Sequence, residues 1–235
     1  MDTSTKSEEN VNLDYNFGNF NPEDVEVEDT INAVFAIDVS ASVGGYADEL
    51  NAGIHDFVER MQKSHVSDKL FVSMVEFNSK VSVRSGFQPI DQIPTIDFGP
   101  SIGGMTALYE GTKVSLVNAL DYRESLENSG VNCKTLLFVI TDGDDNASNC
   151  GPEDVKKIIQ DLLQEERNIA SFESILFGIG TGMESYFNSA AADMGITNVA
   201  TISDTADDIK KMINFISSSV SGASGSANAI STPNF

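Results

Sequence analysis

Three residues with oxygen-bearing side chains lie at alternate positions in the first quarter of this sequence. They are Asp38, Ser40 and Ser42, in a D-x-S-x-S pattern that follows the apolar run 34–37 and precedes Gly44-Gly45. Carboxylate and hydroxyl oxygens are hard donors, which favour Mg²⁺, Mn²⁺ or Ca²⁺ over Zn²⁺. The pattern therefore indicates a loop suited to a divalent cation.

The apolar run in front of this loop predicts a strand buried on both faces, which is typical of parallel sheets. Further strands are predicted at about 69–77, 81–83, 135–141, 174–180 and 197–202. Amphipathic helices are predicted over about 50–61, from 106 to about 120, from 152, over 183–194 and over 204–217, with Asp204 as the N-cap of the last. This alternation predicts a three-layer, doubly wound α/β domain with a mostly parallel sheet, in which the segment 81–83 forms one antiparallel edge strand.

Two further motifs complete a resemblance to the von Willebrand factor A domains. Gly103-Gly104-Met105-Thr106-Ala107-Leu108 matches that family's usual Gly-Gly-x-Thr-x-Leu, and Thr141-Asp142-Gly143 matches its T-D-G. The motifs stand in the family's order and at similar spacing, and the resemblance covers roughly residues 31–217. It implies a Rossmann-like strand order of 3-2-1-4-5-6, with the site at the carboxyl ends of strands one and four. It also implies a metal-ion-dependent adhesion site formed by Asp38, Ser40, Ser42, Thr106 and Asp142.

In such a site the hydroxyls would contact the ion, and the two aspartates would act directly or through water. An open coordination position could then accept an Asp or Glu from a protein partner, without any enzymatic step. The chain looks similar to the intracellular branch of bacterial and phage proteins of the tellurium-resistance type or associated with AAA+ ATPases, which implies an adaptor for such an ATPase or for a larger assembly. Two alternatives stay open: a structural component of a virion or surface assembly, and a metal-dependent phosphoesterase.

The composition limits the classes of binding partner that the protein is expected to have. The formal net charge of −22 over 235 residues argues against nucleic acid and against anionic membranes. No stretch approaches the roughly 20 apolar residues of a membrane span, and the polar N-terminus does not resemble a signal peptide. We therefore expect a cytoplasmic protein with an acidic arm at 1–30, one domain at 31–217 and a flexible Ser/Gly-rich tail at 218–235. Tyr15, Phe17 and Phe20 of the arm could serve as a short binding motif, but docking on the domain is the favoured interpretation.

Weaker patterns lead to no separate function. Cys133 and Cys150 flank a predicted strand about 23 Å long, so two reduced thiols are expected. The stretch 142–153 nearly fits an EF-hand loop but has Ala147 where Gly is required, and it follows a strand. Asp144 and Asp145 could add a second cation or only solvate the loop. Gly178-Ile179-Gly180-Thr181-Gly182 is interpreted as a turn between strand and helix.

Overall fold

A computed structural model of the chain describes residues 29–164, 171–224 and Ile230. The predicted acidic arm, including the proposed docking of Tyr15, Phe17 and Phe20, therefore lies outside the described residues except for positions 29 and 30. Most of the predicted tail also lies outside them.

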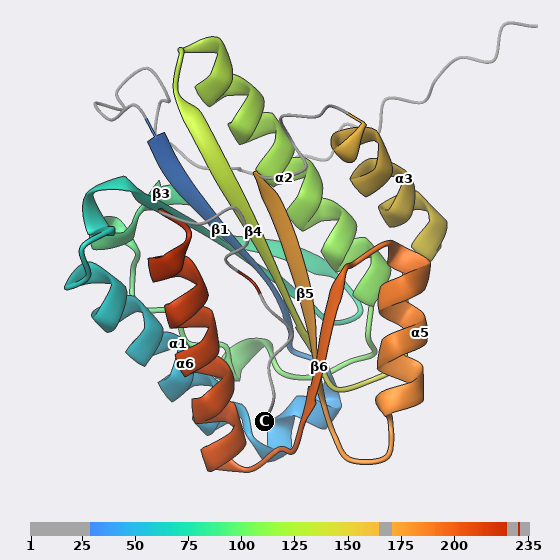
Figure 1. Cartoon of the computed structure of the whole chain (residues 1–235). Coiled ribbons are helices and arrows are strands. Elements are labelled where there is room, and N and C mark those ends of the chain that lie inside the picture. The colour runs from blue at the N-terminus through green and yellow to red at the C-terminus, as the bar shows by residue number, and fades with distance from the viewer. Residues whose placement is uncertain (1–28, 165–170, 225–229, 231–235) are drawn as a thin grey trace, which may run out of the picture.

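The described residues form one six-stranded sheet in the order β3-β2-β1-β4-β5-β6 (Figure 1). Every neighbouring pair is parallel except β2 and β3, which are antiparallel. This confirms the predicted strand order and the single antiparallel edge. The strands are β1 (Asp29–Asp38), β2 (Leu70–Phe77), β3 (Val81–Pro89), β4 (Asn132–Thr141), β5 (Phe172–Ile179) and β6 (Asn198–Ile202).

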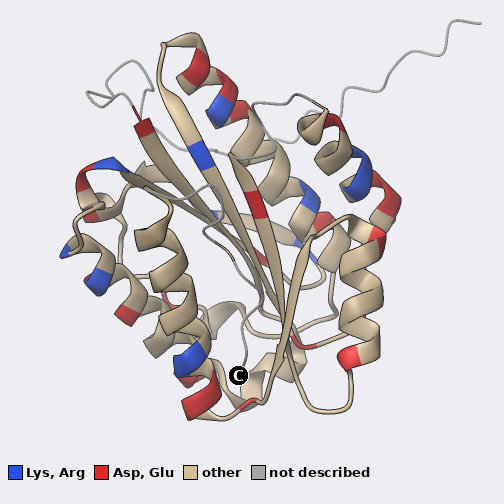
Figure 2. Cartoon of the chain, viewed as in Figure 1, with Lys and Arg blue, Asp and Glu red and all other residues tan. Residues whose placement is uncertain are grey.

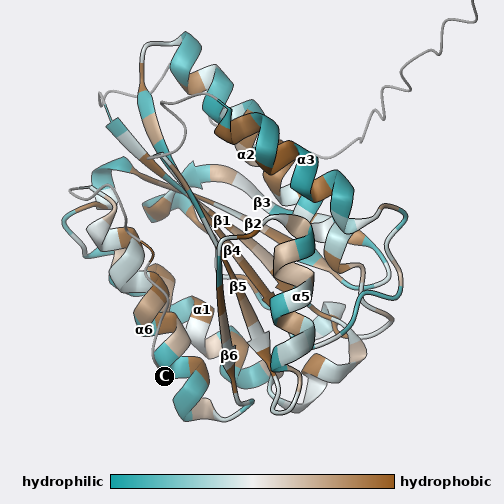
Figure 3. Ribbon diagram, turned by 45° about the vertical axis from the view of Figure 1, so that its right-hand side comes forward, coloured by the Kyte–Doolittle hydropathy of each residue, from teal (hydrophilic) through white to brown (hydrophobic). Residues whose placement is uncertain are grey.

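Helices cover both faces of the sheet, which gives the predicted three layers (Figure 1). Helices α1 (Ala47–Gln62) and α6 (Ala206–Gly222) pack on one face over a core that includes Phe35 and Phe138. Helices α2 (Leu108–Asn128), α3 (Pro152–Leu163) and α5 (Glu184–Met194) pack on the other face. Figure 3 shows the apolar strands enclosed between these helical layers.

The buried strand β1 explains why the site loops meet. All nine residues of β1 after Asp29 are buried, so the strand lies in the middle of the sheet with neighbours on both sides. Ile37 of β1 is in register with Ile140 of β4, so Asp38 and Thr141 end these two strands side by side. The carboxyl ends of adjacent parallel strands in an open α/β sheet are where ligands bind.

Helix α6 differs from its prediction at both ends. Thr205, not Asp204, is the N-cap, because the Thr205 hydroxyl accepts a hydrogen bond from the Asp208 backbone N–H. The helix runs to Gly222 instead of Ser217, since Ser219 and Val220 continue its buried face. Ile230 is also buried and belongs to the core on the α1–α6 side. Residues 218–222 of the predicted flexible tail are thus part of the domain.

Helices α1 and α6 pack tightly against each other at Gly53. A Cβ atom placed on Gly53 of α1 would lie 2.8 Å from the side chain of Ile213 on α6. Glycine at this position therefore allows the two helices to touch.

Two smaller observations concern the cysteines and the helices. Cys133 and Cys150 are free thiols, as expected, and burial raises the pKa of each to about 11, so both are protonated at neutral pH. No helix within the described ranges has the length and apolar character needed to cross a membrane.

Candidate metal centre

Asp38 is the most enclosed residue of the candidate site. Asp38 is the last residue of strand β1 and is only 1% exposed. One carboxylate oxygen, Oδ1, accepts a hydrogen bond of 2.8 Å from the Ser40 backbone N–H. The other, Oδ2, accepts one of 2.7 Å from the hydroxyl of Thr141, the last residue of β4. Both oxygens are thus fixed in direction before any ligand binds.

The two serines connect this loop to Asp142. The Ser40 and Ser42 hydroxyl oxygens lie 3.1 Å apart, and the Ser42 hydroxyl donates a hydrogen bond of 2.7 Å to Oδ1 of Asp142. Ser42 and Asp142 are 100 positions apart in the sequence. The loop after β1 and the loop after β4 are therefore joined through their polar side chains.

Thr106 reaches the same place on a third loop. The Gly103 backbone N–H donates to the Val39 carbonyl (2.9 Å), and the Ala41 N–H donates to the Gly104 carbonyl (3.2 Å). The hydroxyl oxygen of Thr106 would lie 3.7 Å from a Cβ atom placed on Gly143, so it faces the T-D-G loop. The structure thus gathers all five predicted residues, although Thr106 makes no side-chain hydrogen bond to the other four.

The backbone conformation of the Thr106 loop explains why two consecutive glycines, Gly103 and Gly104, occur there. Gly103 and Gly104 have φ angles of 145° and 80°, a region that side chains disfavour. A Cβ atom on Gly104 would also lie 2.6 Å from the Ser79 hydroxyl, which accepts a hydrogen bond of 2.8 Å from the Met105 backbone N–H. The β2–β3 turn therefore holds this loop in place.

Asn146 is a supporting residue that the sequence did not reveal. The side-chain oxygen of Asn146 accepts a hydrogen bond of 2.8 Å from the Thr106 backbone N–H. The backbone N–H of Asn146 donates a hydrogen bond of 2.9 Å to the Thr106 carbonyl. Thr106 is therefore clamped on both sides of its backbone by the loop after β4. This contact spans 40 residues, and no local pattern indicates it.

The electrostatics favour a bound cation. Burial raises the pKa of Asp38 from 3.8 to about 6, against the lowering effect of its hydrogen bonds, and the nearby Asp142 raises it further. The phenol of Tyr46, a second residue that sequence analysis missed, lies near Asp142, Asp38 and Asp204, and burial and these carboxylates raise its pKa. A buried carboxylate is costly unless a positive charge accompanies it.

The donor set also fits a hard cation. It consists of three hydroxyls and two carboxylates, all suited to Mg²⁺, Mn²⁺ or Ca²⁺. In the part of the chain that the structure describes, no three or more His, Cys, Asp or Glu side chains gather in a metal-binding arrangement. A metal at this centre would therefore depend on the serine and threonine hydroxyls.

Asp145, one of the two acids considered for a second cation, is hydrogen-bonded to neighbouring elements. Oδ1 of Asp145 accepts hydrogen bonds from the Ser148 hydroxyl (2.5 Å) and from the Tyr109 backbone N–H (3.4 Å). Oδ1 of Asp145 therefore stabilises the start of α2.

The comparisons with known proteins identify the fold. No protein-family model matches the sequence, and no curated protein matches it. Among solved structures, a von Willebrand factor type A protein from Catenulispora acidiphila matches 83% of this chain with a TM-score of 0.54 and 16% identity. A pilus adhesin, SpaC from Lactobacillus rhamnosus GG, matches 83% with a TM-score of 0.59 and 12% identity. This chain has the von Willebrand factor A fold.

A third similar protein also has a solved structure with a metal bound. Proximal thread matrix protein 1 from the mussel byssus matches 82% of this chain with a TM-score of 0.55 and 17% identity. Another structure of that protein, with a TM-score of 0.50 and 20% identity over 81% of this chain, has a zinc-occupied metal-ion-dependent adhesion site. The matched part covers 47% of the mussel protein, 43% of the Catenulispora protein and 31% of SpaC. Our chain thus spans less than half the length of each.

Proposed function

We propose that this chain is a von Willebrand factor A domain that binds a protein partner through a divalent cation. The ligands are Asp38, Ser40, Ser42, Thr106 and Asp142. The observation that carries this proposal is the convergence of three loops at the carboxyl ends of β1 and β4. There, hydrogen bonds join Asp38 to Thr141, and Ser42 to Asp142.

Mg²⁺ is the proposed ion, with Mn²⁺ or Ca²⁺ as possible substitutes. Two carboxylates can balance the charge of a divalent ion, while neutral hydroxyls leave it able to attract a further anion. The half-exposed side of the site, at Ser42 and Asp142, is open to solvent. An Asp or Glu of the partner would complete the coordination there, so the mechanism is binding and requires no nucleophile or general base.

The cellular role is proposed on analogy of fold and motif. We propose an adaptor for an AAA+ ATPase or a larger assembly, acting in the cytoplasm. The free thiols of Cys133 and Cys150 are compatible with a reducing compartment.

The test has two parts. Mn²⁺ binding to the purified chain, measured by electron paramagnetic resonance, should be lost in Asp38→Ala and retained in Asp144→Ala, a matched exposed acid two residues after Asp142. A pull-down from lysate of the encoding organism should then retain a partner with wild type in Mg²⁺. It should lose that partner in EDTA or with Asp38→Ala. Equal retention in all three samples would show that no metal bridges the partner.

A structural role in a surface assembly is the second candidate. The names of two similar proteins favour it, since one is a pilus adhesin and the other a thread matrix protein. Ordered self-association that is indifferent to chelator, measured by sedimentation, would support this role. The phosphoesterase alternative has weaker support, because two-metal hydrolysis needs ions about 4 Å apart and Asp145 is engaged with α2.

A further inference from the structure

The loop that carries Thr106 also carries an unusual apolar side chain. Met105 is 54% exposed, and it is the exposed large hydrophobic residue of the described part of the chain. Its neighbour Thr106 is buried at 4% exposure. Their Cα atoms are about 3.8 Å apart, as in any trans peptide, so the exposed methionine directly borders the candidate metal centre.

The exposure of Met105 does not result from a loosely held loop. The backbone N–H of Met105 donates to the Ser79 hydroxyl at 2.8 Å, and the N–H of Ala107 donates to the Asn78 carbonyl at 2.8 Å. The carbonyl of Gly104 accepts from Ala41, in the serine loop. Met105 is therefore held in a fixed position, on a loop that is hydrogen-bonded to the serine loop one residue before the exposed Ser42.

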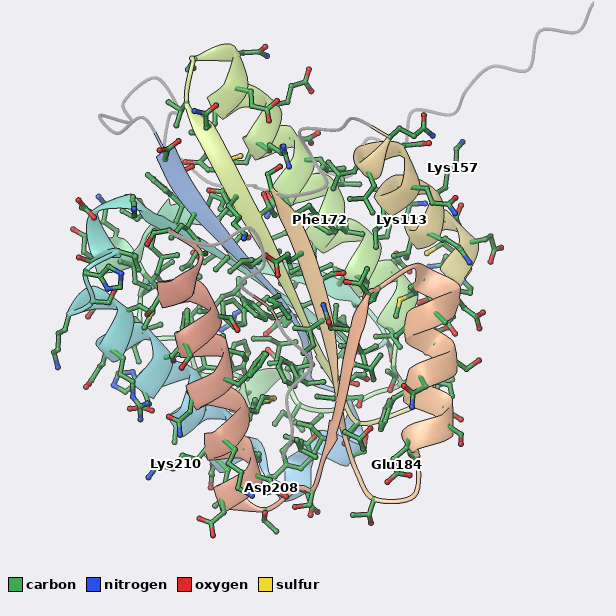
Figure 4. The ribbon with its side chains drawn as sticks, in the orientation of Figure 1. Lys113, Lys157, Phe172, Glu184, Asp208 and Lys210 are labelled. Atoms are coloured by element: carbon green, nitrogen blue, oxygen red, sulfur yellow. The ribbon has the colours of Figure 1, made fainter. Side chains whose placement is uncertain are left out.

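The charges around the site add a second argument. In this fold the helices run opposite to the parallel strands, so they begin at the edge of the sheet where the site lies (Figure 1). Each of the five α-helices in the described part of the chain has at least one Asp or Glu in its first turn: Asp48 and Glu49, Glu110, Glu153 and Asp154, Glu184, and Asp207 and Asp208. Figure 2 colours the acidic residues red along the ribbon, and Figure 4 labels Glu184 and Asp208 at the starts of α5 and α6.

These acids oppose an approaching carboxylate at long range. The cation attracts the carboxylate, but the repulsion by the surrounding acids offsets part of this attraction. A partner would therefore gain from a short-range contact that does not depend on charge. Methionine is suited to this task because its unbranched, polarizable side chain adapts to different apolar surfaces. Single exposed apolar side chains are common on protein surfaces, so what distinguishes Met105 is its fixed position directly next to Thr106.

We propose that Met105 is the apolar half of a two-part recognition site. The metal takes a carboxylate from the partner, and Met105 takes an apolar side chain that lies next to that carboxylate. The partner segment therefore contains an Asp or Glu with an aliphatic or aromatic neighbour. This inference rests on the proposed function, because it assigns the partner's chemistry at the same site.

Two small carboxylates test this directly. Acetate carries only the metal-binding group, whereas 4-methylpentanoate adds a branched apolar tail. We expect the full chain in Mg²⁺ to bind 4-methylpentanoate about fivefold more tightly than acetate, from the burial of one or two methylene-sized groups. With ¹³C-methyl methionine labelling, the Met105 signal should shift on adding 4-methylpentanoate. The Met61 signal should not, because Met61 lies fourteen residues along α1, or about 21 Å, from its first residue.

A variant separates the two parts of the site. Met105→Gln keeps the approximate size of the side chain but removes its apolar character. It should bind Mn²⁺ and acetate as wild type does, and should lose the fivefold preference for 4-methylpentanoate. Equal affinity of wild type for the two carboxylates, or an undiminished preference in the variant, would overturn the role of Met105 and leave the metal centre intact. If neither carboxylate binds better in Mg²⁺ than in EDTA, the proposed function and this inference both fail.

Discussion

The inner and outer halves of the candidate site differ in how their side chains are held. In the inner half, Asp38 is 1% exposed, and both of its carboxylate oxygens accept hydrogen bonds. In the outer half, Ser42 and Met105 are exposed and Asp142 is half-buried. Under the proposed function, the inner half would hold the cation and the outer half would contact the partner. The following predictions separate these two tasks.

Asp38→Asn should have the largest effect of the variants considered. It should weaken Mg²⁺ binding but stabilise the metal-free protein. Losing the inner carboxylate should weaken Mg²⁺ binding by about 100-fold. It should also stabilise the metal-free protein at pH 7.5 by about 1–3 kcal/mol. A pKa raised from 3.8 to about 6 corresponds to about 3 kcal/mol, from which about 1 kcal/mol is subtracted for a weakened hydrogen bond. Urea unfolding in EDTA measures this, and a destabilised variant would show that Asp38 is not strained by its burial.

The Asp38 carboxyl group should also make the folding stability and the Mg²⁺ affinity depend on pH. Because the pKa of Asp38 is higher in the folded than in the unfolded chain, the folded chain binds the extra proton between about pH 6 and 3.8. The contribution of Asp38 to metal-free stability is therefore greatest below pH 3.8 and is lost as the pH rises through 6. Mg²⁺ must displace that proton, so its affinity should fall about fivefold from pH 6 to pH 5. Titration calorimetry measures this fall. Asp38→Asn should flatten the stability trend, and an unchanged trend would assign it to another group.

Ser42→Ala tests the outer half. It removes a hydroxyl ligand and the hydrogen bond to Asp142, so we expect about tenfold weaker Mg²⁺ binding. Since Ser42 is exposed, the free energy of unfolding should change by less than about 0.5 kcal/mol. Ser189→Ala on α5 is the control for both measurements. A large loss of stability in Ser42→Ala would instead make this serine a structural residue.

Asn78→Ala tests the support beneath the outer half. The Asn78 side-chain amide donates a hydrogen bond of 2.9 Å to the Ser101 carbonyl, at the start of the Thr106 loop. Its loss costs about 1 kcal/mol, part of which should appear as a threefold to fivefold loss of Mg²⁺ affinity. Asn188→Ala, on α5, should leave the affinity unchanged. If Asn78→Ala binds Mg²⁺ normally, the backbone contacts alone position Thr106.

The smallest expected effect concerns salt. If the acids at the helix starts repel an approaching anion, screening them should strengthen carboxylate binding at constant Mg²⁺. We expect about a twofold gain in 4-methylpentanoate affinity between 20 and 200 mM NaCl. A decrease would show that the cation, not the surrounding acids, dominates the field at the outer half.

The sequence predicted most of the fold because its signals are local. Apolar runs indicated the strands, and helical periodicity indicated the helices. The three motifs supplied the strand order through the resemblance to a family. The limits of α6 were less certain, since Asp204 and Thr205 are both suited to cap a helix and only the structure shows that Thr205 accepts the bond from Asp208. Tyr46 and Asn146 were missed because they act through contacts between separate loops, which no periodicity records.

The contact at Gly53 has a mechanical consequence. Helix α1 begins directly after the serine loop, and at Gly53 it touches Ile213 of α6 without room for even one more carbon. Such close packing resists relative movement of the two helices, so we expect a displacement of α6 to be passed to α1 and through it to the loop of Ser40 and Ser42.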